Sequence, residues 1–343
     1  MRAVASLGPE DLKLIDAPDP AVEAATDAVV RVSLTALCGA DLFPYHGYVP
    51  GFLAGTILGH EFVGVVESVG SAVTTVKPGD RVVSNSTISC GTCTACRAGR
   101  SSQCPDRALF GYSGVYQQLH GGQAELVRVP MADRALKVIP ASVTDEQAVF
   151  VADMLPTGYS GFRRADLSSG DVAVVVGCGT VGLMATLFAT RVARTVIAVD
   201  GIEERRRLAT LFGATAVTPD EAAGAIAAAT EGLGADGVIE AAGSPGALTA
   251  AIGFARGLGT VSVIGAHFEP DFPLNMGLMF ERELTLRVTW GHGFDDRDRI
   301  LAMLAAGTID PTPAISHRFA LADVAEAYRV FDAREATKVL LVP

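Results

Sequence analysis

Residues 172–182 read VAVVVGCGTVG, and this stretch decides the fold of the 343-residue chain. Its five leading apolar residues predict a buried strand, and the segment after Gly182 predicts a helix. Between them, Gly177, Gly179 and Gly182 form the pattern G-x-G-x-x-G. The first glycine permits a tight turn, the second lets the backbone approach a pyrophosphate, and the third lets the helix pack closely on the strand. The stretch therefore predicts a dinucleotide site whose phosphates face the start of the helix.

Asp200 stands at the end of the next predicted strand, 18 residues beyond Gly182. A carboxylate there accepts hydrogen bonds from the adenosine ribose hydroxyls and repels a 2′-phosphate, which favours NAD(H) over NADP(H). Arg205 and its neighbours could instead meet such a phosphate, so NADP(H) remains possible. Thr180 and Val181 open the helix that faces the phosphates. The alternative for the whole motif is a tight turn without a ligand.

Strands and helices alternate from Asp171 onward, and this alternation predicts an α/β domain with a doubly wound parallel sheet. A second G-x-G-x-x-G at residues 232–237 follows a helix and precedes a strand, so it is predicted to be a loop. The predicted strands are Val172–Val176, Thr195–Val199, Gly237–Glu240 and Thr260–Ile264, and the predicted helices are Val181–Thr190, Glu203–Phe212, Pro245–Ala255, Arg297–Ala306 and Leu321–Ala333.

The first ~150 residues have a different pattern. Short β-type runs at Ala28–Leu34, Phe62–Val69 and Arg81–Val83 are separated by turns rich in Gly, Pro and Asp. They predict an irregular, barrel-like β domain, and a last strand at Lys338–Val342 is expected to return to it. The pattern changes near Pro156, and two domains are the default for a chain of this length.

Four cysteines, Cys90, Cys93, Cys96 and Cys104, stand in the pattern C-x2-C-x2-C-x7-C. Cysteines so close together suit one tetrahedral metal better than two disulfides. The pattern predicts a closed, structural Zn²⁺ site that holds a surface lobe. The alternatives are a redox cluster and an iron–sulfur site, although nothing else in the sequence indicates electron transfer.

Composition excludes several classes of protein. The net charge is −11, and no basic run extends beyond Arg205–Arg207, so nucleic-acid binding is not expected. Residues 172–190 carry no charge, but their glycines indicate a strand and a helix, so no membrane span is expected. The first residues show no apolar signal segment, which predicts a cytoplasmic protein with reduced thiols.

Cys38 and His60 are the remaining candidates for a metal site. A lone Cys or His is more often structural, but Asp153 supplies a carboxylate just before the second domain. A set of one Cys, one His and one Asp leaves the fourth position of zinc open for water or a substrate oxygen. The three residues therefore predict a catalytic zinc.

These segments together resemble the zinc-dependent medium-chain dehydrogenase/reductase family, the alcohol dehydrogenases. The resemblance covers essentially the whole length of the chain. The segments that carry it are Cys38-Gly39-x-Asp41, Gly59-His60-Glu61-x-x-Gly64, residues 77–82 (KPGDRV), the four-cysteine lobe, Gly121-Gly122-x-Ala124-Glu125, residues 153–158 and the glycine pattern at 177–182.

The resemblance implies a GroES-like catalytic domain around a Rossmann dinucleotide-binding domain. It places the catalytic domain at residues 1–155 and 293–343, with the structural zinc lobe at about 88–106, and the Rossmann domain at 156–292. It also implies two Zn²⁺ per chain and a homodimer or homotetramer formed through the sheet edge near Thr260–Ala266.

The resemblance also implies roles for individual residues. Catalytic zinc would be bound by Cys38, His60 and Asp153, with Glu61 as a near or exchangeable ligand. Thr157 and Val181 would press the nicotinamide ring toward the metal, and Lys338 would meet the cofactor phosphates. The alternative for Glu61 is a carboxylate outside the ligand set, and for Thr157 an ordinary helix or turn residue.

The chain departs from the family where alcohol protons are relayed. The family usually has Ser or Thr at the position of Ala40, and close relatives have His at the position of Phe43. Tyr45 and His46 are candidate substitutes, although an exposed loop histidine is the simpler interpretation of His46. The change also makes the pocket more apolar, next to Phe43, Phe52 and Trp290, which suits a bulky or hydrophobic substrate.

Three functions are therefore considered for a small-molecule substrate. The leading hypothesis is interconversion of an alcohol and its aldehyde or ketone by hydride transfer. The alternative is reduction of an iminium or an activated carbon–carbon double bond, because such reactions leave no alkoxide at the position of Ala40. A minor alternative is a non-catalytic nucleotide or redox sensor.

Overall fold

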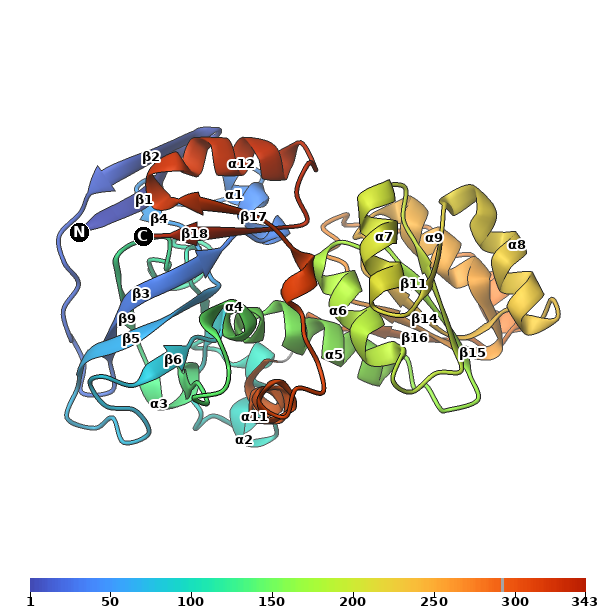
Figure 1. Cartoon of the computed structure of the whole chain (residues 1–343), viewed down its shortest axis with the longest axis horizontal. Coiled ribbons are helices and arrows are strands. Elements are labelled where there is room, and N and C mark those ends of the chain that lie inside the picture. The colour runs from blue at the N-terminus through green and yellow to red at the C-terminus, as the bar shows by residue number, and fades with distance from the viewer. Residues whose placement is uncertain (291–292) are drawn as a thin grey trace. The chain divides into compact units, whose positions relative to one another are not determined.

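The computed structural model describes residues 1–290 and 293–343 and shows two compact units (Figure 1). The first unit comprises Met1–Asp153 and His292–Pro343, and the second comprises Met154–Gly291. The sequence places the domain limits at residues 155–156 and 292–293, and residue 292 lies outside the described residues.

The first unit is built on β-sheets. Its largest sheet has the order β10-β6-β5-β3-β18-β17, with β9 also paired to β3. In β3, exposed Arg31 and Ser33 alternate with buried Val30 and Val32, as expected for a strand with one covered face. The strands of this sheet are β3 (Ala28–Ala36), β5 (Phe62–Val69), β6 (Arg81–Val83), β9 (Leu126–Val129), β10 (Lys137–Val138), β17 (Ile315–Ala320) and β18 (Lys338–Val342).

Smaller sheets and short helices complete this unit. The other strands are β1 (Arg2–Gly8), β2 (Asp11–Asp16) and β4 (Thr56–Ile57), in the order β2-β1-β4, and the pair β7 (Thr87–Ile88) and β8 (Ala108–Leu109). The α-helices are α1 (Leu42–Tyr45), α2 (Thr94–Arg97), α3 (Ala132–Ala135), α4 (Asp145–Ala148), α11 (Gly293–Ala305) and α12 (Val324–Asp332). The 3-10 helices are η1 (Gly39–Asp41), η2 (Ser101–Gln103), η3 (Val149–Ala152), η4 (Thr312–Ala314) and η5 (Leu321–Asp323).

The last strand of the chain, β18, returns to the N-terminal sheet, which confirms the predicted return. It pairs antiparallel with β3, with Leu340 opposite Ala36 and Leu341 opposite Thr35. This pairing places Lys338, at the start of β18, beside Leu37, at the end of β3, and so fixes a C-terminal residue close to Cys38.

The second unit is a six-stranded sheet with the order β13-β12-β11-β14-β15-β16, and every strand pair is parallel. This confirms the doubly wound sheet. Its strands are β11 (Val172–Val176), β12 (Thr195–Val199), β13 (Thr215–Val217), β14 (Ala235–Glu240), β15 (Ala255–Val263) and β16 (Thr285–Val288). Its helices are α5 (Met154–Arg164), α6 (Thr180–Ala189), α7 (Glu203–Leu211), α8 (Pro219–Thr230), α9 (Pro245–Phe254) and α10 (Met276–Glu281).

Helices cover both faces of the parallel sheet. Val172, Val174 and Val176 of β11 belong to one apolar cluster that includes buried residues of α8 and α9. On the other face, α5 packs so closely that a Cβ at Gly161 would lie 2.7 Å from Ile264. Because both faces are covered, β11 is apolar throughout instead of alternating, which is why residues 172–176 read as one run of apolar residues.

Several boundaries differ from the prediction. Strand β15 begins at Ala255, inside the predicted helix, and the second glycine match ends within β14 and is not entirely loop. Residues 172–190 divide into β11, the glycine loop and α6. In residues 1–290 and 293–343, no helix combines the length and apolar character needed to span a bilayer.

Candidate functional site

The four-cysteine lobe is a loop closed by the β7–β8 pair. The four sulfur atoms lie within 4.8 Å of one another, and no cysteine of the chain forms a disulfide. Backbone N–H groups of Cys90, Cys93 and Cys96 each point at the sulfur of another member of the set at 3.4 Å. Hydrogen bonds from the backbone N–H groups of Thr92 and Cys93 lower the pKa of the Cys90 thiol to about 6. Such N–H groups stabilise thiolates, which are the form that binds a metal.

A second cluster gathers Cys38, His60, Glu61 and Asp153 from three places in the first unit. Cys38 follows β3, His60 and Glu61 precede β5, and Asp153 follows η3. One ligand atom of each residue lies within 4.8 Å of the others. His60 Nε2 is 3.4 Å from Asp153 Oδ2 and 3.9 Å from Glu61 Oε1.

The donor atoms of this cluster fit a zinc ion. Zinc bonds of about 2.0–2.3 Å place tetrahedral ligand atoms about 3.3–3.8 Å apart, which is the scale of the observed separations. His60 is 1% exposed and Glu61 is fully buried, yet His60 Nε2 and Glu61 Oε1 have no hydrogen-bond partner among the described residues. Buried polar atoms normally find a partner, so a cation is the natural occupant of the space they face.

Burial and neighbouring charges shift the pKa of three members of the cluster. Burial raises the pKa of the Cys38 thiol, and Glu61 adds to this effect. Burial also raises the pKa of Glu61, against the lowering effect of Lys338. For His60, burial lowers the pKa but Asp41 and Cys38 raise it by more. Metal binding generally releases protons from Cys, His and carboxylate ligands, so a divalent cation in the cluster would favour the deprotonated forms of Cys38, His60 and Glu61.

Asp41 orients two of these residues at once, and sequence reasoning did not assign it a role. Its Oδ1 lies 3.2 Å from His60 Nδ1, and its Oδ2 accepts a hydrogen bond of 2.9 Å from the backbone N–H of Cys38. The carboxylate is 1% exposed. It therefore fixes the histidine ring with Nε2 toward the cluster. The signal in the sequence was its position three residues after Cys38.

Replacing Asp41 with asparagine is expected to weaken zinc binding at the Cys38 cluster by about 10–100-fold, because partners of metal ligands typically contribute this much. The measurement is zinc loss to a graded series of chelators. The four-cysteine lobe serves as the internal control, because its sulfur atoms make no contact with Asp41 in the described hydrogen bonds. Equal retention of both zinc ions in the variant would contradict the role of Asp41.

Lys338 has a partner that sequence reasoning did not assign. Its Nζ donates to the Leu37 carbonyl oxygen at 2.7 Å and forms an ion pair with Glu61 Oε2. The residue is 1% exposed. Lys338 is therefore a buried partner of Glu61, and its implied contact with the cofactor phosphates stays a prediction.

The relay position is apolar, as in the sequence, but a hydroxyl approaches it from elsewhere. The Tyr112 hydroxyl donates to the backbone carbonyl oxygen of Ala40. The Tyr112 ring is 8% exposed and meets Phe52 edge to face at 6.4 Å. Burial raises the pKa of Tyr112, so its phenol stays neutral and cannot act as a base. Sequence reasoning missed Tyr112, because a residue 72 positions from Ala40 gives no local signal.

The two candidate substitutes for the relay have other partners. His46 Nε2 lies 3.0 Å from Asp332 Oδ1 and its Nδ1 lies 3.4 Å from Glu10 Oε1. The Tyr45 ring packs against Tyr328 with ring centroids 5.3 Å apart. Both ring nitrogens of His46 thus face carboxylates, which favours the simpler interpretation of His46 as a structural loop residue.

The His46 contacts give stability a pH dependence. The hydrogen bond with Asp332 raises the pKa of His46, burial opposes this, and Glu10 adds to the rise. A raised folded pKa means that the contribution is fully present below the unfolded value of about 6.5 and is lost as pH rises through the folded value. The His46 side chain is 21% exposed and both carboxylate partners are more exposed, so the effect is expected below about 1 kcal/mol. Thermal unfolding of the native protein and H46Q should differ at pH 5.5 and coincide at pH 9; a difference that persists at pH 9 would contradict the pairing.

The glycine loop of the second unit has the geometry expected of a phosphate cradle. Gly177 has φ of +92°, and a Cβ there would lie 2.8 Å from the backbone N of Ala242. A Cβ at Gly182 would lie 1.8 Å from the Gly177 carbonyl oxygen. At Gly179 a Cβ would meet nothing within 4 Å, so the backbone there borders open space. Gly179 also begins α6 without a side-chain cap, which fits an anion at the helix N-terminus.

Asp200 lies beside this loop. Its Oδ2 accepts a hydrogen bond of 2.7 Å from the Cys178 N–H, and its Oδ1 accepts one of 2.8 Å from the Ile202 N–H. Each oxygen keeps further acceptor capacity for ribose hydroxyls. Arg205 Nη1 is 3.9 Å from Asp200 Oδ2 and its Nε has no partner among the described residues. Arg205 thus lies near the end of β12, and its contact with a 2′-phosphate stays a prediction.

The remaining predicted residues are placed as follows. Thr180 and Val181 form the first turn of α6 and are half-buried. Thr157 lies half-buried in α5, and its contact with the nicotinamide ring stays a prediction. Phe43 and Phe52 are half-buried in the first unit, whereas Trp290 is 52% exposed in the second.

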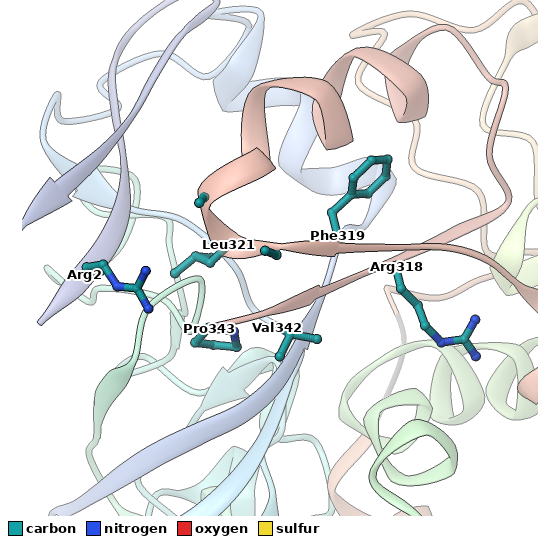
Figure 2. Close-up of a pocket in the computed structure, with 8 residues that line it drawn as sticks. Arg2, Arg318, Phe319, Leu321, Val342 and Pro343 are labelled. Carbon is teal, nitrogen blue, oxygen red and sulfur yellow. The ribbon is translucent and has the colours of Figure 1, made fainter.

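A separate pocket of about 390 Å³ lies at β17, η5 and the chain end (Figure 2). Its two arginines are occupied, because Arg2 pairs with Glu125 and Arg318 forms two hydrogen bonds with Glu146. None of the predicted site residues lines it. This pocket is therefore assigned no part in the chemistry.

Two family models match the sequence. One, described as the alcohol dehydrogenase GroES-like domain, matches residues 24–140. The other, described as zinc-binding dehydrogenase, matches residues 180–306.

Known proteins resemble the chain over its full length. A probable zinc-binding alcohol dehydrogenase of Mycobacterium tuberculosis is 36% identical, covering 99% of this chain and 87% of its own. The solved structure of the alcohol dehydrogenase TADH from Thermus sp. ATN1 matches with a TM-score of 0.96 and 37% identity, covering 100% of this chain and 99% of that one. A putative zinc-binding dehydrogenase of Sinorhizobium meliloti, solved bound to NADP, matches with a TM-score of 0.86 and 30% identity, covering 100% and 99%.

Proposed function

The chain belongs to the zinc-dependent medium-chain dehydrogenase family, and from this premise we propose its function in detail. The chain is a zinc-type, nicotinamide-dependent oxidoreductase that interconverts an alcohol and its aldehyde or ketone. The finer assignments that follow, of two metal sites, the cofactor preference, the assembly and the compartment, are our proposals. The observation that carries them is the convergence of Cys38, His60, Glu61 and Asp153.

Two Zn²⁺ per chain are proposed. The catalytic zinc would be held by Cys38, His60 and Asp153, with Glu61 as an exchangeable fourth ligand, and the structural zinc by the four-cysteine lobe. The catalytic assignment is supported by the unpartnered His60 Nε2 and Glu61 Oε1, and the structural one by four sulfur atoms without a carboxylate among them. The all-sulfur set is closed, whereas the mixed set leaves room for substrate.

The reaction assigns distinct tasks to the residues of the first unit. A zinc ion bound there supplies a Lewis acid that polarises a carbonyl oxygen or stabilises an alkoxide, and nicotinamide carries the hydride. Asp41 Oδ1 lies 3.2 Å from His60 Nδ1 and its Oδ2 accepts a hydrogen bond from the backbone N–H of Cys38, so one carboxylate orients two ligands. Lys338 holds one oxygen of Glu61 and leaves the other facing the cluster.

Proton transfer is where this chain differs from a typical alcohol dehydrogenase. Ala40 offers no side-chain hydroxyl, and the neutral Tyr112 phenol already donates its proton to the Ala40 carbonyl. Reduction of an iminium or an activated double bond therefore remains the second candidate, although the relatives named above are alcohol dehydrogenases. The sensor hypothesis is not supported, because both matching models describe dehydrogenases.

Assays of substrate classes separate the two candidates. Purified protein with measured zinc content would be assayed with NADH and NADPH against aldehydes, ketones, cyclic iminium ions and enones. Carbonyl reduction supports the leading function, and turnover restricted to iminium or enone substrates overturns it. The variant A40S restores a relay hydroxyl and is expected to raise alcohol oxidation at least about tenfold, because positioned proton transfer is typically worth 10²–10⁴-fold. An unchanged rate would show that the relay does not limit the reaction.

NAD(H) is proposed as the preferred cofactor, with NADP(H) as the alternative. Asp200 supports NAD(H), because its carboxylate would repel a 2′-phosphate. Arg205 supports the alternative, because its guanidinium lies beside that carboxylate. Comparing kcat/KM for the two cofactors in the native protein and D200A tests the assignment: relief of discrimination against NADPH is expected.

A homodimer or homotetramer is proposed, through β16 and not through Thr260–Ala266. Residues 260–263 lie in β15, which is paired on both sides by β14 and β16, so the prediction that this segment is the sheet edge is wrong. β16 is the edge strand, and Val288, Phe280 and Met276 on β16 and α10 are 71%, 85% and 62% exposed. Exposed apolar side chains beside an open edge favour a second copy. A monomer by sedimentation would contradict this.

A cytoplasmic location is also proposed. All six cysteines are free in the structure, which suits a reducing compartment. No nucleic-acid or membrane partner is proposed for a chain with a net charge of −11.

A further inference from the structure

Glu240, at the end of β14, and His267, four residues beyond β15, form a pair to which the proposed reaction gives no role; Glu240 is buried, whereas the His267 side chain is 19% exposed. Glu240 is fully buried, and its Oε1 accepts hydrogen bonds of 2.8 Å from the N–H groups of Ala242 and Gly243. Its Oε2 lies 3.1 Å from His267 Nε2. His267 Nδ1 lies 3.4 Å from Glu269 Oε2, on a side chain that is 38% exposed.

The pair adjoins the glycine loop. The N–H of Ala241 donates to the Val176 carbonyl oxygen at 2.8 Å, and Gly177 packs against Ala242 so closely that a Cβ on Gly177 would lie 2.8 Å from the Ala242 nitrogen. Glu240 accepts hydrogen bonds from the N–H groups of Ala242 and Gly243, which lie in the turn that packs against the glycine loop. Its carboxylate therefore stabilises the turn that contacts this loop.

The strand order places the pair on the nicotinamide side. In the sheet, β12 lies on one side of β11 and β14 lies on the other. Asp200, at the end of β12, marks the adenosine side, and the start of α6 marks the pyrophosphate. A dinucleotide that crosses the carboxyl ends of these strands must therefore extend its nicotinamide half toward the ends of β14 and β15, where Glu240 and His267 lie.

Charge distinguishes the two forms of the cofactor at this end. The nicotinamide ring is cationic when oxidised and neutral when reduced. A buried carboxylate favours the oxidised form, whereas a protonated imidazole beside it offsets that preference, because charges interact strongly where water is excluded. We propose that the Glu240–His267 pair sets the relative affinity for oxidised and reduced cofactor, and that His267 offsets the charge of Glu240. This inference rests on the proposed nucleotide site.

The test measures binding, not turnover. NADH binding is followed by the fluorescence of NADH itself, and NAD⁺ binding by competition, in the native protein, H267Q, E240Q and the double variant. The measurements are made at pH 6.0, where free histidine is mostly protonated. The ratio Kd(NADH)/Kd(NAD⁺) is expected to rise about five- to tenfold in H267Q, to fall by a similar factor in E240Q, and to return within about twofold of the native value in the double variant.

Matched measurements keep the result interpretable. E269Q removes the exposed carboxylate against the same ring and is expected to change the ratio less than about twofold, because exposed charges are screened. If E240Q does not fold, H267Q carries the test, with E269Q as its control.

An H267Q protein that weakens both cofactor forms equally, or neither, would overturn the proposal and leave the pair a structural element. Failure of the native protein to bind either form would instead overturn the proposed nucleotide site. The two failures are therefore distinguishable.

Discussion

Replacing Lys338 with methionine is expected to lower the free energy of unfolding by about 3–5 kcal/mol, because it leaves a buried carboxylate without its partner. Lys338 and Glu61 are 1% and 0% exposed, and the lysine also donates to the Leu37 carbonyl oxygen. Methionine keeps the length and apolar stem of the side chain but removes both interactions. Urea unfolding of the native protein and K338M measures the difference.

The double variant E61Q/K338M is the matched control. It removes both charges, so no uncompensated ion remains, and it is expected to recover most of the lost stability. If K338M and the native protein unfold at the same urea concentration, the Lys338–Glu61 pair does not stabilise the position of the C-terminal strand.

Lys338 also shows where sequence reasoning ends. The pair joins residues 277 positions apart, and their proximity follows from the antiparallel register of β18 on β3. The sequence predicted the returning strand from its apolar residues, but it carries no signal for the register. The ion pair with Glu61 is therefore visible only in the structure, whereas the phosphate contact of Lys338 rests on the family resemblance alone and stays a prediction.

Local patterns were more informative. The strand, glycine turn and helix at residues 172–189 are consecutive in the chain, so their spacing alone predicted β11 and α6 within one residue at each end. The four-cysteine lobe is similarly local. Tyr112 contacts Ala40 and His267 contacts Glu240, and in each pair the two residues are far apart in the chain. The spacing of residues in the sequence therefore could not predict either contact.

The open sheet edge shows the same limit. Thr260–Ile264 is recognisable as a strand from its apolar residues, but its position in the sheet depends on whether another strand follows it. The short β16, whose residues are exposed or half-buried, gives a weak strand signal, and the predicted edge near Thr260–Ala266 rests on the family resemblance alone.

Replacing Cys38 with alanine is expected to lower the zinc content from two ions to one and alcohol oxidation by at least about 10³-fold. A Lewis-acid metal supplies several kcal/mol of transition-state stabilisation, and each 1.36 kcal/mol is a factor of ten in rate. The fold should persist, because Cys38 lies in a turn at the end of β3 and Lys338 holds the preceding carbonyl.

Replacing Cys93 with alanine should reduce stability more than activity, the reverse of what is expected for C38A. Loss of the lobe zinc removes a cross-link between four positions of one loop, so thermal stability should fall more than in C38A, while the Cys38 cluster keeps its metal. C178A is the matched control for zinc content, because Cys178 is a buried cysteine outside both clusters and should keep two zinc ions. Two zinc ions in C38A would contradict the catalytic assignment, and two in C93A the structural one. Because the two variants lose the same number of ions but different properties, together they separate the metal that performs chemistry from the metal that maintains the fold.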